Sequence, residues 1–220
     1  VLSRKNSHEQ ELFRYKRQLK VIEDMMRDGI ISKENKQLLG NSKHDDLIRK
    51  LVDSVKPDLI TLSGDNAWGY VSYIETIKLV ESFGIPWAPI MGNHDGEGAA
   101  TEFWNAYTLA NAQNCLFKFG PKDMGYGNYI INITENGKIV HSLFMMDTHS
   151  YADFEVDGEV VDGYDHLWSN QIEWYKNTSA EIKSENADET VYAMAFQHII
   201  VQEIYEMMFY EFPFVLGKAT

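Results

Sequence analysis

Two short polar runs, each directly after an apolar stretch, constrain this chain more than any other feature. Ser63-Gly64-Asp65-Asn66 follows the stretch at residues 57–62, and Met91-Gly92-Asn93-His94-Asp95 follows the stretch at residues 85–90. Both apolar stretches have the length and the β-branched content of buried strands. Strand ends of an α/β sheet are where ligand sites form. The two runs therefore predict a site built from consecutive strand tips.

The residue types in these runs are those of a metal site. Gly64 and Gly92 allow a sharp backbone turn, so that the residues after them project from the strand ends. Asp65, Asn93 and His94 then supply a carboxylate, an amide oxygen and an imidazole. A carboxylate can bridge two cations about 3.5–4 Å apart, the spacing that two-metal hydrolases use. For Asp65 and Asn93 the alternative is an ordinary turn residue that bonds nearby backbone.

Further matches downstream give the pattern a family. Phe196-Gln197-His198-Ile199 follows the strand-like residues 191–195, Gly127-Asn128-Tyr129 precedes a strand, and Gln171-Ile172-Glu173-Trp174 falls on a helix. Together with the two polar runs, these segments resemble the calcineurin-like metallophosphoesterase superfamily, which includes purple acid phosphatases and bacterial phosphohydrolases. The resemblance covers about residues 45–210.

The resemblance implies a fold and a ligand set. The fold is α/β, a layered α/β/β/α sandwich of two mixed sheets flanked by helices. Two divalent or mixed-valence metal ions, such as Mn, Fe or Zn, would be bound. Asp65 would bridge them, and Asn93 and His198 would be ligands of the second ion, although a single His after a strand can also be a core residue.

The same resemblance implies an activity, the hydrolysis of a phosphate ester by a metal-activated hydroxide. His94 would donate a proton to the leaving oxygen or stabilise the developing charge, which suits an imidazole near neutral pKa. Asp95, also a candidate catalytic residue, would orient His94 or form a structural hydrogen bond. The substrate would be a phosphate-ester small molecule or a phosphorylated partner.

Two blocks of the superfamily pattern are missing from this sequence. The family opens with a strand that ends in Asp-x-His and closes with Gly-His-x-His, and neither occurs in the expected place. An orienting carboxylate that some members place three residues after the bridging Asp is replaced here by Trp68. We interpret the chain as apparently incomplete at both ends, or alternatively as a member that has lost one metal. In the second case we expect at most one tightly bound metal.

A third possibility is a substitute ligand pair within the chain. Asp147-Thr148-His149 follows the apolar residues 143–146, so it is an Asp-x-His run at a strand end. It comes after residues 91–95, in the wrong order for the family's first block. Direct metal ligation by Asp147 or His149, a structural role, and a pocket-rim role for His149 are all open.

The rest of the chain predicts one domain over residues 1–220, in which residues 1–44 form a helical segment without the family's first strand. We expect a hairpin turn at 135–137 and a surface loop over the acidic, Gly-containing residues 152–165. The expected helices lie at about 9–28, from 45 or 46, 71–83, 99–111, 167–183 and 201–211, and the strands at 57–62, 85–90, 129–134, 138–146 and 190–196.

Charge and hydropathy exclude several classes of function. The net charge of −13 argues against a nucleic-acid or anionic-membrane binder, which needs a basic face. No apolar run approaches the roughly 18 residues of a membrane span. Two rival functions are a non-catalytic scaffold of the same fold that binds a protein partner, and a nuclease of the same superfamily, which the charge disfavours. The sequence does not indicate a cellular location.

Overall fold

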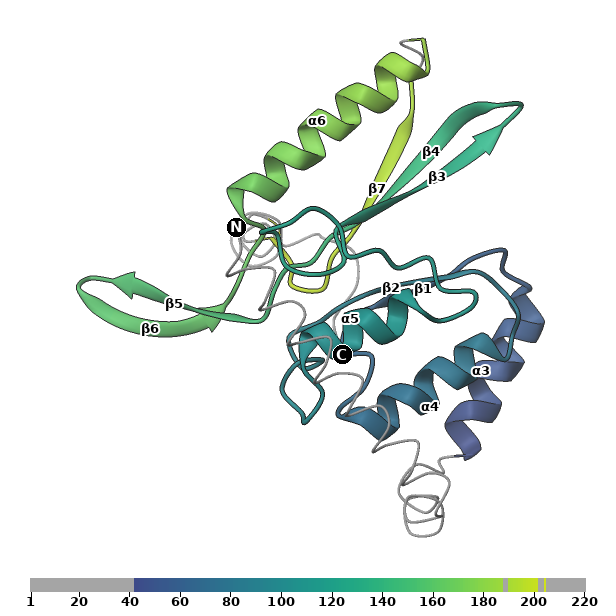
Figure 1. Cartoon of the computed structure of the whole chain (residues 1–220), viewed down its shortest axis with the longest axis horizontal. Helices are drawn as coiled ribbons and strands as arrows, with labels where there is room; N and C mark the ends of the chain where they lie inside the picture. The colour runs from purple at the N-terminus through teal and green to yellow at the C-terminus, as the bar shows by residue number, and fades with distance from the viewer. Residues whose placement is uncertain (1–41, 188–189, 202–203, 205–220) are drawn as a thin grey trace, which may run out of the picture. The chain divides into compact units, whose positions relative to one another are not determined.

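The computed structural model describes residues 42–187, 190–201 and 204, and Figure 1 shows its helices and strands. The chain divides into two compact units, Val1–Lys56 and Pro57–Thr220. In the first unit the described element is helix α3, Ser42–Val55, close to the helix expected from residue 45 or 46. The helix expected at 9–28 lies outside the described residues. The prediction of a single domain over residues 1–220 stays a prediction.

The second unit begins with a parallel pair of strands. β1 (Ile60–Ser63) and β2 (Trp87–Ile90) pair along their whole length, from Ile60 opposite Trp87 to Ser63 opposite Ile90. Parallel strands need a crossover connection, and helix α4 (Tyr70–Glu81) provides it. Because the strands are parallel and in register, the loops that follow Ser63 and Ile90 leave the same edge.

An aromatic core surrounds the fully buried strand β2. Trp87 of β2, Tyr73 of α4 and Trp104 of helix α5 (Glu102–Ala110) are each at most 1% exposed. The rings of Tyr73 and Trp104 meet edge to face with centroids 6.1 Å apart. At the start of α5, the Thr101 side chain accepts a hydrogen bond from the Trp104 N–H, as an N-cap residue does. Burial of these large rings fixes the helices against the strand.

A second sheet contains three strands in the order β3-β4-β7. β3 (Tyr129–Glu135) and β4 (Lys138–Met145) form an antiparallel hairpin, and β7 (Tyr192–Phe196) adds to β4 in parallel. The hairpin turn expected at 135–137 is confirmed, since Asn136 and Gly137 both have positive φ, 51° and 79°. Such a pair of residues matches the twist of the strands.

Helix α6 (Ser169–Glu185) packs on this sheet through an apolar cluster of Phe144, Met146 and Ile182. The Phe144 ring meets Tyr175 of the helix edge to face at 4.7 Å. The two sheets are joined where the Tyr129 hydroxyl donates a 2.7 Å hydrogen bond to the Pro89 carbonyl. The expected α/β architecture, with helices against both sheets, is confirmed.

The prediction of a surface loop at residues 152–165 is wrong. This segment forms an antiparallel hairpin of β5 (Tyr151–Val156) and β6 (Glu159–Tyr164). Asp157 and Gly158 make the turn with φ of 54° and 83°, and an Asp-Gly pair is a strong signal for such a turn. The many carboxylates of this segment concealed the alternation of apolar and polar residues on either side of the turn.

Two remaining expectations concern the C-terminal region and membrane spans. The helix expected at 201–211 lies almost wholly outside the described residues. Among the described residues, no helix combines the length and the apolar character that a bilayer crossing requires.

Candidate metal centre

The loop after β1 turns sharply at Gly64 and Asp65, whose φ values are 95° and 53°. Only glycine fits at position 64, because a Cβ there would lie 2.5 Å from His198 Nδ1. Gly92, in the loop after β2, is equally crowded, since its Cβ would lie 2.3 Å from Asp65 Oδ1. A non-glycine residue at positive φ, as at Asp65, is a conformation that surrounding structure must hold in place. The two glycines thus allow the strand-end loops and His198 to approach one another.

The structure brings the three predicted metal ligands together. His198 Nε2 lies 3.1 Å from Asn93 Oδ1 and 3.3 Å from Asp65 Oδ1. Asp65 follows β1, Asn93 follows β2 and His198 follows β7, so three separate strand ends contribute. The His198 and Asp65 side chains are 22% and 35% exposed, and Asn93 is 4% exposed. The cluster is accessible from solvent at its Asp65 side.

The hydrogen bonds behind this cluster orient its donor atoms. His198 Nδ1 lies 2.8 Å from the Ser63 carbonyl oxygen, which can only accept, so Nδ1 carries the proton. A neutral His198 ring therefore turns the lone pair of Nε2 towards Asn93 and Asp65. The Asn93 amide is oriented by its Nδ2, which donates a 2.6 Å hydrogen bond to the Tyr151 hydroxyl.

Three electron-pair donors facing one another repel unless a cation or a proton lies between them. A carboxylate oxygen, an amide oxygen and an imidazole nitrogen form a ligand set for a divalent transition metal, and a backbone carbonyl on the other ring nitrogen is the usual support of a metal-binding His. The residues fit a cation. Among the described residues, no group of three or more His, Cys, Asp or Glu side chains has metal-binding geometry, so this set depends on the amide of Asn93.

His94 lies at the edge of the cluster. Its backbone N–H donates a 3.0 Å hydrogen bond to Asp65 Oδ1, and its side chain is 47% exposed. Nδ1 of the ring lies 2.7 Å from Glu97 Oε2, and this hydrogen bond raises the pKa of His94. The exposed Trp68 ring is nearly parallel to the imidazole, with centroids 6.0 Å apart. Trp68 thus walls one side of His94.

Asp95 faces away from solvent and into the two loops. It is fully buried, and its carboxylate accepts hydrogen bonds from the backbone N–H groups of Gly92 (2.7 Å), Asn66 (2.9 Å) and Ala67 (3.3 Å). Burial raises the pKa of Asp95, while these backbone hydrogen bonds act in the opposite direction. This geometry favours the structural alternative for Asp95, which ties the β1 loop to the β2 loop.

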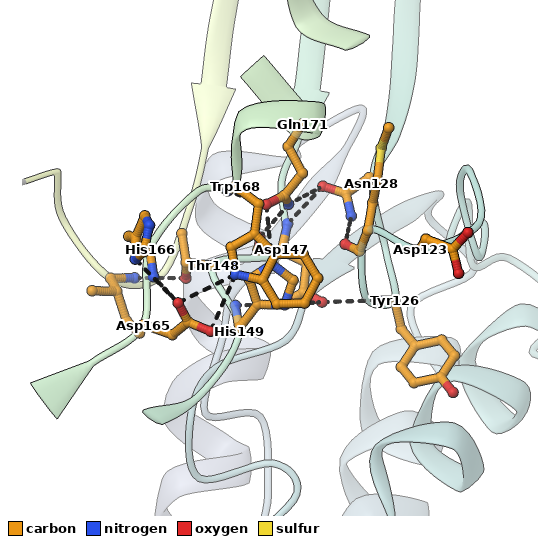
Figure 2. A network of polar contacts seen from close by, with 12 residues as sticks. Asp123, Tyr126, Asn128, Asp147, Thr148, His149, Asp165, His166, Trp168 and Gln171 are labelled. Carbon is orange, nitrogen blue, oxygen red and sulfur yellow. Dashed lines mark hydrogen bonds and ion pairs between the residues drawn. The ribbon is translucent and has the colours of Figure 1, made fainter. Parts of the chain in front are cut away.

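Asp147 and His149, the other candidate ligands, belong to a separate network after β4 (Figure 2). Asp147 Oδ2 accepts from the Tyr126 N–H and Oδ1 from the His149 N–H, both at 2.8 Å. His149 Nε2 lies 3.0 Å from Gln171 Oε1, and the ring stacks on Trp168 at 3.8 Å. The side chains of Asp147 and His149 are 8% and 11% exposed. The chain itself engages these groups, which favours structural roles over metal ligation.

Gln171 is the hub of this network and is fully buried. Its Oε1 accepts from the Trp168 N–H at 2.7 Å, at the start of α6, while its Nε2 donates to Asn128 Oδ1 at 2.9 Å and to the Asp147 carbonyl at 2.6 Å. Because Nε2 is the donor, Oε1 must accept from His149 Nε2–H. The segments at 127–129 and 171–174 therefore hold α6 against the second sheet.

With this geometry established, comparison with known protein families gives a clear match. Residues 40–208 match the family model of the calcineurin-like phosphoesterase domain. The chain belongs to the calcineurin-like phosphoesterase family. No solved structure matches the chain significantly.

The curated relatives of this chain carry names of two kinds. Phosphatase DCR2 of Saccharomyces cerevisiae is 33% identical over 180 residues, which cover 73% of this chain and 29% of that protein. "Probable inactive purple acid phosphatase 14" of Arabidopsis thaliana is 30% identical over 160 residues, 63% of this chain and 39% of the relative. "Probable inactive purple acid phosphatase 28" of the same plant is 27% identical over 192 residues, 75% of this chain and 47% of the relative.

The chain thus spans less than half the length of these relatives. Its family is one of hydrolases that act on phosphate esters and usually bind divalent metals. Relatives named as inactive occur beside one named as a phosphatase. Family membership therefore supports phosphoester hydrolysis in general.

Two residues of this candidate site were not among the sequence-based candidates. Glu97 bonds the His94 ring, and the Tyr151 hydroxyl donates to Glu97 Oε1 at 2.7 Å. Glu97 stands three residues after His94, so its proximity could have been inferred from the loop. Tyr151 lies 58 residues from Asn93, at the edge of the segment expected to be a loop, and only the hairpin places it here.

Proposed function

We propose that this domain hydrolyses a phosphate ester with the help of divalent cations bound by Asp65, Asn93 and His198. The observation that carries the proposal is the meeting of His198 Nε2 with Asn93 Oδ1 at 3.1 Å and with Asp65 Oδ1 at 3.3 Å. Oxygen and imidazole ligands suit Mn, Fe or Zn. Following the family resemblance, Asp65 would be shared by two ions.

The roles of the chain's own groups follow from their positions. Divalent cations at such a centre lower the pKa of water and act as Lewis acids towards phosphoryl oxygens. Asp65, Asn93 and His198 hold the centre, while His94, whose N–H bonds Asp65, presents its ring beside it. An imidazole in that position can deliver a proton to the leaving oxygen, which is a strong base in an alkyl ester. Asp95 keeps both loops in place.

The substrate we propose is a phosphorylated small molecule or a phosphorylated partner. The net charge of −13 repels polyanions, so a nuclease activity is disfavoured. A compact phosphate ester is still acceptable, because cations reverse the sign of the local potential.

A non-catalytic scaffold is the second candidate. Relatives named as inactive favour it. A scaffold predicts one bound metal or none, and no turnover. His94 argues for the enzyme, since a scaffold has no use for an imidazole at that position.

The deciding experiment compares two substrates on the full chain supplied with Mn²⁺. His94→Asn should retain the metal, but lower kcat on an alkyl phosphate by about 10²–10⁴-fold. On an aryl phosphate, whose leaving group needs no proton, the loss should be smaller. His141→Asn, at an exposed position on β4, is the matched control and should leave both rates unchanged.

Each other outcome decides against part of the proposal. Equal losses on both substrates would contradict the general-acid role of His94. If the unaltered chain with Mn²⁺ had no turnover, the scaffold would be favoured.

A further inference from the structure

A continuous chain of hydrogen bonds links the His94 ring to the Asn93 amide through two residues on different elements. His94 Nδ1 lies 2.7 Å from Glu97 Oε2, the Tyr151 hydroxyl donates to Glu97 Oε1 at 2.7 Å, and Asn93 Nδ2 donates to the Tyr151 oxygen at 2.6 Å. Glu97 belongs to the loop after β2, whereas Tyr151 is the first residue of β5. The base of the β5–β6 hairpin is therefore bonded to the candidate metal centre.

The donor and the acceptor of each hydrogen bond in this series follow from the chemistry of the groups. An ionised carboxylate only accepts, so both the His94 Nδ1–H and the Tyr151 O–H must donate to Glu97. The Tyr151 oxygen is then available as the acceptor for Asn93 Nδ2. These hydrogen bonds lower the pKa of Glu97, which keeps the carboxylate in its ionised, accepting form.

The fixed hydrogen-bond directions have consequences at both ends of this series of hydrogen bonds, at His94 and at Asn93. At one end, Nδ1 of His94 is committed to Glu97, which leaves Nε2 as the nitrogen that can face a substrate. At the other end, Asn93 must turn its Oδ1 towards His198, 3.1 Å away. Without the Tyr151 hydroxyl, the amide could rotate and present Nδ2, which cannot bind a cation.

We propose that Glu97 and Tyr151 are positioning residues, and that one carboxylate sets the orientation of both the His94 imidazole and the Asn93 metal ligand. The inference rests on the proposed phosphoester hydrolysis at this site. It assigns the β5–β6 hairpin a part in that hydrolysis, because Tyr151 of β5 supplies the middle hydroxyl.

Only a carboxylate satisfies both donors. In Glu97→Gln, the amide has a single acceptor oxygen and a nitrogen that donates, so either His94 Nδ1–H or the Tyr151 O–H loses its acceptor. In Tyr151→Phe, the ring remains but Asn93 Nδ2 and Glu97 Oε1 both lose a partner. The matched control is Tyr164→Phe, because Tyr164 is the cross-strand neighbour of Tyr151 and stacks on it at 5.7 Å, outside the hydrogen-bond chain.

The first measurement is Mn²⁺ affinity of the full chain, by titration calorimetry, without any substrate. Loss of a group that orients a metal ligand typically weakens affinity about 10–100-fold, and we expect about 10-fold for Tyr151→Phe. Tyr164→Phe should stay within about twofold of the unaltered chain, since it removes an equivalent hydroxyl from the same hairpin.

The second measurement is the tautomer of His94, read from its ring ¹⁵N shifts in the metal-free chain and assigned with His94→Asn. The proton should be on Nδ1 in the unaltered chain, and the Nε2–H form should increase in Glu97→Gln. For the Mn²⁺ form, we expect Glu97→Gln to lower kcat about 10-fold or more with little change in KM, because substrate binding does not need the ring's orientation.

The outcomes separate this inference from the function on which it rests. If the unaltered chain binds Mn²⁺ and hydrolyses the ester, but Tyr151→Phe matches Tyr164→Phe in affinity and Glu97→Gln keeps the His94 tautomer, the positioning role is wrong and the hydrolase stands. If the unaltered chain does not bind Mn²⁺, the proposed function fails, and this inference fails with it.

Discussion

The candidate metal centre and the network around Gln171 use the same residue types but differ in what their polar atoms face. In the first, the oxygens of Asp65 and Asn93 meet Nε2 of His198 within 3.3 Å. In the second, Asp147 and Gln171 meet N–H donors supplied by the chain (Figure 2). The side chains of Asp65 and His198 are 35% and 22% exposed, against 8% and 11% for Asp147 and His149.

This difference distinguishes a candidate ligand site from a structural hydrogen-bond network. A buried polar network in which every acceptor has a donor makes the fold rigid and has no need of a ligand. In the candidate metal centre, the oxygens of Asp65 and Asn93 and the His198 ring nitrogen converge, and a cation between them would complete the arrangement. Asp, Asn and His after a strand are therefore insufficient to identify a metal site, because the donors around them decide the role.

The largest effect that tests the comparison is expected for Asp65→Asn. Asn tolerates the positive φ of 53° at this position, so the change removes the charge and preserves the turn. We expect loss of most bound metal and a fall in turnover of about 10³-fold, with little change in unfolding free energy. Elemental analysis and urea unfolding measure the two. Full metal content in this variant would contradict the assignment of Asp65.

The opposite pattern is expected for Gln171→Leu in the buried network. Leucine removes the Gln171 partner of the Trp168 N–H, the His149 ring and the Asp147 carbonyl. We therefore expect a loss of about 3 kcal/mol in unfolding free energy. The metal content of the folded fraction should be unchanged. Gln113→Leu, at an exposed position, controls for added apolar surface. If Gln171→Leu lost metal at full stability, the distinction between the two regions would be wrong.

The smallest effect concerns the pH dependence of stability at Asp147. Burial raises the pKa of Asp147 above its ordinary value of 3.8, so the folded chain binds a proton at a higher pH than the unfolded chain does. The contribution of this group to stability therefore increases as pH falls through the raised pKa, and levels off below 3.8.

The measurement is the difference in unfolding free energy between the unaltered chain and Asp147→Asn at pH 7 and pH 4. This difference should move in favour of the unaltered chain at pH 4, by less than the loss expected for Gln171→Leu. Asp123→Asn, at an exposed loop position with φ of 64°, is the control for removing a carboxylate from the surface. A pH-independent difference for Asp147→Asn would show that burial in the folded chain does not destabilise the ionised form of Asp147.

The sequence predicted the parts of this fold that local chemistry controls. Asn136-Gly137 fixed the β3–β4 turn, and apolar runs before Gly64 and Gly92 located β1 and β2. The order of the motifs also predicted that Asp65, Asn93 and His198 would meet, and the structure brings them together, while their ligation of metal stays a prediction.

Prediction from the sequence failed where the structure depends on contacts between residues that are far apart in the sequence. Asp157-Gly158 is as good a turn signal as Asn136-Gly137, but the acidic residues around it indicated a loop. The role of the Tyr151 hydroxyl depends on Glu97, 54 residues away, and no local pattern encodes that distance. Likewise, the donors around Asp147 come from residues 126 and 149 together, so its sequence context alone left ligation open.

The hydrogen bond between His198 and the Ser63 carbonyl spans 135 residues, and its consequence concerns folding. A centre assembled across such a separation cannot exist in the unfolded chain, because closing so long a loop comes late and is entropically costly. A cation bound there would stabilise the folded chain over the unfolded chain. At a free cation concentration of one hundred times the dissociation constant, the free energy of unfolding would rise by about 2.7 kcal/mol, and the melting temperature would rise with cation concentration. The thermal shift caused by an added metal would then report whether β1, β2 and β7 have come together.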